Sequence, residues 1–190
     1  MPEQDVIIGI AEARAGTVTR PAAVGRVVQV NISPGGVPKL PVQEVRVRRL
    51  GLDGDDHNDA ADHGGPMRAV SLLAIEAIRR VAADGNPIAP GTTGENVTTE
   101  GIELGELAYG IRLVIGTELV IELTAPANPC RTIAHNFADG RFGRMSVKAH
   151  PLDTRVYASV VREGTIRPGD EIRVLDQQRV RRRGAAPPRK

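Results

Sequence analysis

The stretch Val-Gly-Arg-Val-Val-Gln-Val-Asn-Ile at residues 24–32 decides the fold class, because its valines and isoleucine are interspersed with polar residues as in a half-buried β-strand. Residues 42–50 have the same character, and a loop rich in glycine and proline at residues 33–39 separates the two segments. Many short strands with few helices predict a mostly β protein, built as a mostly antiparallel barrel rather than a doubly wound sheet. Further strands are expected at residues 111–115, 119–124, 156–161 and 171–175.

Helical spacing is clear in one segment, residues 72–83. An apolar stripe runs along it, and the sequence Asp-Gly-Asn-Pro at residues 84–87 ends it. The stripe consists of Leu72, Ile75, Ala77, Ile78 and Val81. No repeat and no sustained alternation of strands and helices accompanies this helix.

Length and charge predict one domain with two flanking segments. The 190 residues suit a single domain, and the formal charge of +2 hides a basic end, since six basic and no acidic residues lie in residues 179–190. Without that end the chain has 19 basic residues (25 minus six) and 23 acidic ones, or −4. We expect an N-terminal extension at residues 1–23, a barrel domain at residues 24–176 and a disordered basic tail at residues 177–190.

Composition also narrows the location and the partners of the protein. The longest early apolar run, residues 6–10, is too short for a membrane or secretory segment, and a single cysteine makes no internal disulfide. A cytoplasmic protein without membrane partners is therefore expected. Aromatic residues make up only 2% of the chain and tryptophan is absent, which argues against single-stranded nucleic acid as a specific ligand.

The single cysteine lies in Asn128-Pro129-Cys130-Arg131, a sequence typical of a helix start. With Asn128 as the N-cap, Cys130 falls in the first turn, where the positive helix end and Arg131 are expected to lower the pKa of the thiol. The alternative is that Cys130 is a small buried apolar residue. Because of the N-cap pattern, a reactive thiol and a buried apolar residue are about equally expected at Cys130.

Three loops carry more glycine and polar residues than a simple connection needs. The loop at residues 51–66 holds His57, His63 and five aspartates, which suit either a metal site or, as we favour, a turn stabilised by aspartate side chains. The loop at residues 90–98 offers positive-φ glycines beside Thr, Glu and Asn side chains. In the loop at residues 35–39, backbone N–H groups and Lys39 are suited to an anion.

Taken in order, six segments resemble the MOSC domain, the module similar to the C-terminal part of molybdenum cofactor sulfurases. The resemblance covers about residues 24–175 and is closest to the small single-domain bacterial members that are linked with detoxifying N-hydroxylated bases. Two departures are Ala127, where arginine is common, and Gly110-Ile111, where Gly-Asp is common. The segments are residues 35–39, 51–55, 63–70, 90–96, 126–130 and 164–170.

The resemblance implies a β-barrel that binds a molybdenum cofactor of the molybdopterin type. Cys130 would be the molybdenum ligand and a catalytic residue, Lys39 and Arg131 would receive the cofactor phosphate, and Asn96 would bond the pterin edge. His63 would donate to the anion or deliver a proton, or it would only brace the adjacent turn. The other expected cofactor contacts are Gly64, Gly65, Arg68, Thr93, Gly94 and Glu95.

Two function classes follow from this resemblance. As an oxidoreductase, the protein would reduce an N-hydroxylated small molecule with electrons from a separate electron-donor protein, since the chain has no haem, flavin or iron–sulfur motif. As a carrier, it would hold the molybdenum cofactor, or sulfur as a persulfide on Cys130, and pass it on. No desulfurase domain is recognisable in the chain to generate that sulfur.

Overall fold

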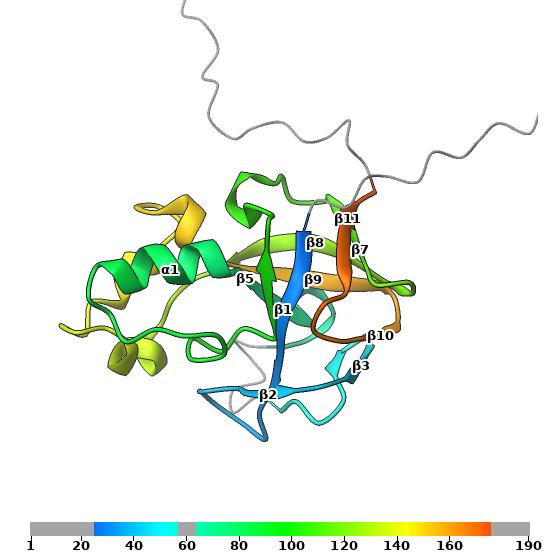
Figure 1. Ribbon diagram of the computed structural model, residues 1–190, viewed down its shortest axis with the longest axis horizontal. Helices are drawn as coiled ribbons and strands as arrows, with labels where there is room; N and C mark the ends of the chain where they lie inside the picture. Colours follow the sequence, from blue (N-terminus) through cyan, green and yellow to red (C-terminus); the bar gives the residue numbers. More distant parts are fainter. Residues whose placement is uncertain (1–24, 57–63, 176–190) are drawn as a thin grey trace, which may run out of the picture.

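A computed structural model describes residues 25–56 and 64–175, so the predictions for residues 1–23 and 177–190 lie outside it. Seven strands close into a ring in the order β11-β7-β8-β9-β5-β6-β1, and pairing between β1 and β11 completes the circle (Figure 1). All these neighbours are antiparallel except β5 and β6. The prediction of a mostly β barrel is confirmed. The ring strands are β1 (Gly25–Ile32), β5 (Val70–Ala74), β6 (Val97–Glu100), β7 (Arg112–Ile115), β8 (Leu119–Ala127), β9 (Arg155–Arg162) and β11 (Glu171–Val174).

Four short strands lie beside the ring. Strand β2 (Leu40–Val42) pairs with the end of β1, and a separate three-stranded sheet has the order β10 (Gly164–Ile166), β3 (Val45–Arg48), β4 (Gly51–Leu52). The expected strand at residues 42–50 is therefore divided, because the chain turns after Val42 and again after Arg48. Its middle part forms β3, in which Val45 and Val47 face the core and Arg46 and Arg48 face solvent.

The predicted helix begins three residues later than expected. Residues 72–74 belong to β5, whose five residues are all buried, and α1 covers Ile75–Ala83. Leu72 packs in the barrel core, whereas Leu73 packs in a second apolar cluster with Ile78 and Val81 of α1. A strand buried on both faces has a continuous apolar run, and such a run does not differ in sequence from the start of a buried helix.

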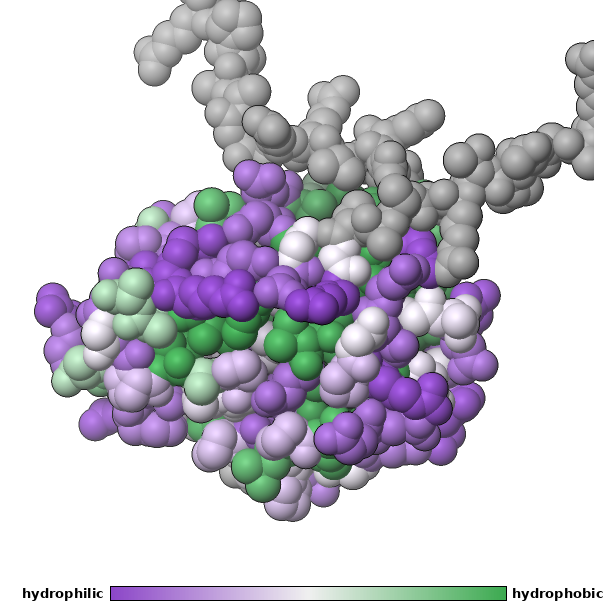
Figure 2. All heavy atoms as spheres, viewed as in Figure 1, coloured by the Kyte–Doolittle hydropathy of each residue, from purple (hydrophilic) through white to green (hydrophobic). Residues whose placement is uncertain are grey.

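Five short 3-10 helices lie in the connections of the described residues, and the one following β8 contributes to the second cluster. This helix, η3 (Arg131–Asn136), places Ile133 beside the α1 residues. The others are η1 (Pro66–Arg68), η2 (Leu104–Glu106), η4 (Phe142–Met145) and η5 (Pro151–Asp153). Among the described residues, no helix has the length and apolar character needed to cross a bilayer. Most of the face in Figure 2 is hydrophilic, with separate apolar areas between the hydrophilic ones.

Candidate functional site

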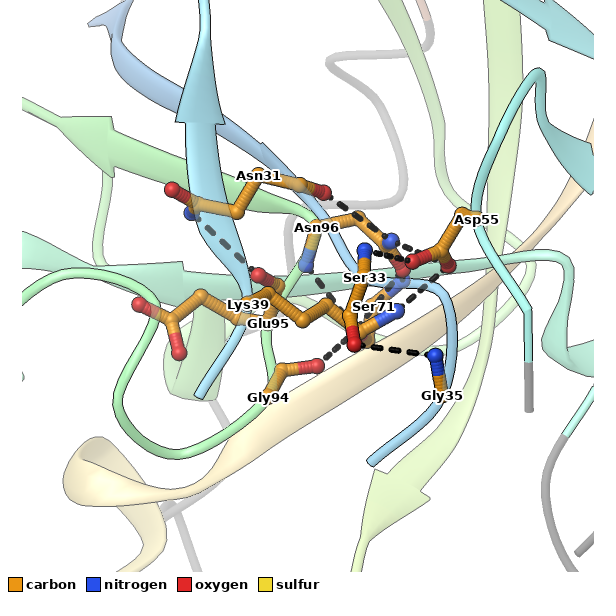
Figure 3. A network of polar contacts seen from close by, with 9 residues as sticks. All are labelled: Asn31, Ser33, Gly35, Lys39, Asp55, Ser71, Gly94, Glu95 and Asn96. Atoms are coloured by element: carbon orange, nitrogen blue, oxygen red, sulfur yellow. Dashed lines mark hydrogen bonds and ion pairs between the residues drawn. The ribbon is translucent and has the colours of Figure 1, made fainter. Parts of the chain in front are cut away.

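The loops at residues 33–39, 53–56 and 90–96 meet in one buried polar network beside the end of β1 (Figure 3). Lys39 Nζ forms an ion pair with Asp55, and Asn96 Nδ2 donates to the same carboxylate at 2.8 Å. The backbone N–H of Ser33 donates to the other Asp55 oxygen at 2.9 Å. Asp55 thus joins one loop to the other two.

Asn96 is buried and its amide is fully used inside the protein. Its Oδ1 accepts from the backbone N–H and the hydroxyl of Ser71 at 3.1 and 3.0 Å, and its Nδ2 donates to Asp55 and to the backbone oxygen of Asn31. A direct bond from Asn96 to a pterin would have to replace one of these contacts. The arrangement therefore supports a structural role for Asn96, which holds the loop at residues 90–96 against β1 and β5.

Glu95 is likewise enclosed, with 0% of the residue exposed. Its carboxylate accepts from the backbone N–H of Gly91 at 2.6 Å and from the hydroxyls of Thr93 and Thr98 at 2.9 and 3.1 Å. Three donors satisfy a carboxylate that would otherwise be costly to bury. Glu95 and Thr93, both expected to contact the cofactor, are thus used to shape their own loop.

Lys39 connects the loop at residues 33–39 to its neighbours through both its backbone and its side chain. Its backbone N–H donates to the carbonyl of Gly91 at 2.9 Å, while its ammonium pairs with Asp55. The pKa of Lys39 is lowered, mainly by burial; pairing with Asp55 opposes this effect, and the positive charge of Arg155 adds to it. Lys39 was expected to meet an anion, and in the fold that anion is a carboxylate of the protein.

Arg155, at the start of β9, is a site residue that the sequence did not single out. It is 6% exposed, and its Nη1 would lie 3.3 Å from a Cβ added at Gly94. Gly94 has a φ of +86°, and the absence of a side chain there leaves room for the guanidinium and for Val37. The sequence signal is faint, because one arginine before an apolar strand is ordinary.

Cys130 lies three residues beyond the end of β8 and is partly exposed. It occupies the N-cap of η3 with an extended backbone, so the prediction that Asn128 is the N-cap and that Cys130 lies in the first turn is wrong. Because η3 is a six-residue 3-10 helix, the expected effect of a helix dipole on the thiol loses its basis. What brings this segment to the site is packing of Ile133 and a 2.7 Å bond from Asn136 Nδ2 to the carbonyl of Thr92.

Four of the remaining predicted residues are described, and the others lie outside the described ranges. Gly64 and Gly65 have φ of 97° and 81°, as expected for a tight turn, and Arg68 lies over the ring of Tyr157 at 5.8 Å. Arg131 is exposed beside Cys130. Both histidines of the loop at residues 51–66, His57 and His63, lie outside the described residues, so their roles stay predictions.

Two of the three aspartates of the same loop that the structure describes contact basic side chains of the protein. Asp55 pairs with Lys39, and Asp53 accepts from Arg48 at 2.6 and 3.0 Å. Asp55 also closes the turn that follows β4, because its backbone N–H donates to the carbonyl of Leu52. These contacts fit the interpretation of an aspartate-stabilised turn.

Comparison with known sequences identifies the class of protein. The family model for the MOSC domain matches residues 59–173, more than half of the chain, and the chain therefore belongs to the MOSC domain family. This family is generally associated with binding of a molybdenum cofactor. The family resemblance expected from the six sequence segments is confirmed.

Two curated relatives are similar to this chain in sequence. The chain is 28% identical over 147 residues to the uncharacterized protein YflK of Bacillus subtilis, covering 75% of this chain and 64% of YflK. It is 28% identical over 109 residues to the protein YiiM of Escherichia coli, covering 55% of this chain and 48% of YiiM. The chain thus spans less than two thirds of the length of either relative.

Solved structures share the fold. The structure of YiiM from Geobacillus stearothermophilus matches with a TM-score of 0.63 at 22% identity, over 80% of this chain and 76% of that one. The YuaD protein of Bacillus subtilis matches with a TM-score of 0.61 at 20% identity, over 80% of this chain and 93% of that one. At these identities the match concerns the fold alone.

Proposed function

We propose that this protein binds a molybdenum cofactor of the molybdopterin type through Cys130 and reduces N-hydroxylated compounds. The observation that carries the proposal is the position of the chain's single thiol: partly exposed, three residues beyond the end of β8, in a MOSC domain. A soft thiolate suits a higher-valent metal that already has sulfur ligands.

The residues around the thiol fit such a group chemically. Cys130 is a free cysteine and is already partly exposed. Arg155 supplies a buried positive charge on β9, the strand that pairs with β8. Arg131 is exposed next to the thiol and has room to approach a phosphate. In this proposal Cys130 holds the metal, Arg131 orients the cofactor, and the Lys39–Asp55 network keeps the neighbouring loops in place.

The reaction proposed is R–NHOH + 2 e⁻ + 2 H⁺ → R–NH₂ + H₂O. The N–O bond breaks, a separate electron-donor protein supplies the two electrons, and the oxygen leaves as water with the two added protons accounting for the new N–H and O–H bonds. When bound, the cofactor would supply the oxygen-accepting, two-electron chemistry that amino-acid side chains lack. His63 is the proposed proton donor for this step.

The test compares the wild-type protein with Cys130→Ser, both produced in cells that make the cofactor. Wild-type protein should contain molybdenum by elemental analysis and reduce an N-hydroxylated base when a reductase and its electron source are added. The serine variant should lose this activity and keep its melting temperature, because serine is nearly isosteric with cysteine. Equal activity in the two proteins would contradict the role of Cys130.

A separate outcome would favour the carrier function. Bound molybdenum that depends on Cys130, without reduction of any N-hydroxylated compound by any electron donor tried, would indicate a cofactor carrier. A mass increase of one sulfur atom on Cys130 after incubation with a sulfur donor would indicate a persulfide carrier.

A further inference from the structure

Arg155 is a buried cation without an anionic partner in the described part of the chain. No hydrogen bond or ion pair joins its guanidinium to residues 25–56 or 64–175. Arg173 provides the comparison, because it is similarly buried, at 8% exposed, and its guanidinium contacts the Glu171 carboxylate at 2.6 Å. Buried charges are normally paired, so the guanidinium of Arg155 has capacity for a ligand.

The carboxylates of Asp55 and Glu95, which like Arg155 act on the charge of Lys39, are already used by other donors. Asp55 accepts from Lys39, Asn96 and Ser33, and Glu95 accepts from two donors of its own loop and from Thr98 of β6. The ammonium of Lys39 is close enough to Arg155 for their like charges to repel. The positive charge of Arg155 therefore remains uncompensated among the described residues.

The guanidinium is also within reach of a ligand. In the described residues, fully enclosed side-chain nitrogens and oxygens without a partner belong to Glu76 and Thr99 alone, so the unpartnered nitrogens of Arg155 keep some contact with solvent. Gly94, which has no side chain, borders the same space. Arg155 pairs with Ala127 across β8 and β9, and Cys130 follows Ala127 by three residues.

We propose that Arg155 binds an oxyanion, phosphate or carboxylate, of the ligand that occupies the space beside Cys130. The planar guanidinium is suited to such a group because its N–H donors match two oxygens at once. The identity of the ligand rests on the proposed function, whereas the anion site itself does not.

The first experiment measures the anion site in protein without cofactor. The melting temperature is followed against inorganic phosphate at constant ionic strength for the wild type, Arg155→Gln and Arg173→Gln. Phosphate should stabilise the wild type and Arg173→Gln in a saturable way, since a ligand that binds only the folded state raises its stability. Arg155→Gln should show apparent binding at least about tenfold weaker. An equal response of Arg155→Gln, or no response of the wild type, would overturn the proposal.

A structural role for Arg155 predicts a different result. If Arg155 only supported the fold, Arg155→Gln would lower the melting temperature in the absence of phosphate, as expected for Arg173→Gln, which removes the contact between Arg173 and Glu171. A ligand-binding arginine without an internal partner should give an unchanged or higher melting temperature when neutralised. A fall as large as that of Arg173→Gln would contradict the proposal.

The second experiment identifies the source of the oxyanion. If it is the cofactor phosphate, Arg155→Gln purified from cofactor-producing cells should contain less molybdenum than the wild type. If it is a substrate carboxylate, the molybdenum content should be kept, while KM rises for an N-hydroxylated substrate with a carboxylate and not for a neutral analogue. An absence of molybdenum in the wild type would count against the proposed function and leave the phosphate result standing.

Discussion

Lys39 and Asp55, from two different glycine-rich loops, form an ion pair whose side chains are 7% and 1% exposed. The Asp55 carboxylate also accepts from Asn96 of the third loop. One carboxylate thus fixes the relative positions of the loops that surround Gly94 and Arg155. Neutralising it separates the contribution of this network to stability from its contribution to ligand binding.

Asp55→Asn should lower the free energy of unfolding by about 3 kcal/mol or more, because the amide leaves the buried ammonium of Lys39 without a counter-charge. Unfolding in urea measures this loss. The double variant with Lys39→Met and Asp55→Asn should recover a large part of it, since both charges of the ion pair are then removed together. Asp53→Asn is the control in the same loop: its partner Arg48 is well exposed, so little change is expected. Equal losses at the two aspartates would contradict the role of burial.

The pH dependence of stability should contain a contribution from Lys39. Its pKa in the folded protein is lowered below the ordinary value of 10.5, so between the two values the folded state binds fewer protons than the unfolded state. Stability from this group must then rise with pH across that window, and it must be constant below the lowered pKa. The measurement is the difference in unfolding free energy between the wild type and Lys39→Met, followed from neutral pH to 10.5. A difference that stays flat, or that moves against the wild type, would refute this sign.

The barrel could be predicted from sequence wherever one face of a strand is polar. Residues 24–32 alternate enough to identify β1, and residues 156–161 fall inside β9. Strand β5 was assigned in part to the helix, because Val70–Ala74 is buried on both sides and has no polar face to mark its period. The sequence of β6 predicts part of a loop for a related reason: Val97, Thr98 and Thr99 are all buried, and two of them are polar.

The site was predictable as a set of loops and not as a set of contacts. Glycine and polar residues at 35–39, 51–66 and 90–98 marked the right segments. Which side chains bind a ligand and which bind one another depends on burial, and burial arises only when the loops meet. For this reason Asn96 and Glu95 are expected from sequence to contact a cofactor, whereas Arg155, which is buried beside Gly94, is not expected at all.

Two substitutions of Glu95 should have very different costs. Glu95→Gln keeps an oxygen for the Gly91 N–H and the Thr98 hydroxyl, and its amide can donate to the Thr93 hydroxyl, so a loss of about 1 kcal/mol is expected. Glu95→Ala leaves three buried donors without an acceptor and should cost about 3 kcal/mol or more. Unfolding in urea gives both values. Similar losses for the two variants would mean that the negative charge of Glu95, rather than its acceptor geometry, holds the loop.

Gly94→Ala should destabilise the protein more than Gly140→Ala and should also weaken the response to phosphate. Both glycines have positive φ, +86° and +70°, so each alanine meets a conformational cost of about 1 kcal/mol. A Cβ at Gly140 has no neighbour within 4 Å, whereas at Gly94 it would lie 2.7 Å from Val37 Cγ1 and 3.3 Å from Arg155 Nη1. The difference in unfolding free energy between the two variants therefore measures the crowding at Gly94 alone.

The double variant Val37→Ala with Gly94→Ala tests this reasoning further, because it removes the atom that a Cβ at Gly94 would meet first. It should recover part of the stability lost in Gly94→Ala, although Val37→Ala alone destabilises by removing apolar packing. The phosphate response should stay weakened in the double variant, since the new Cβ still borders the guanidinium of Arg155. A full phosphate response in Gly94→Ala would show that the space beside Gly94 is not the path by which an oxyanion reaches Arg155.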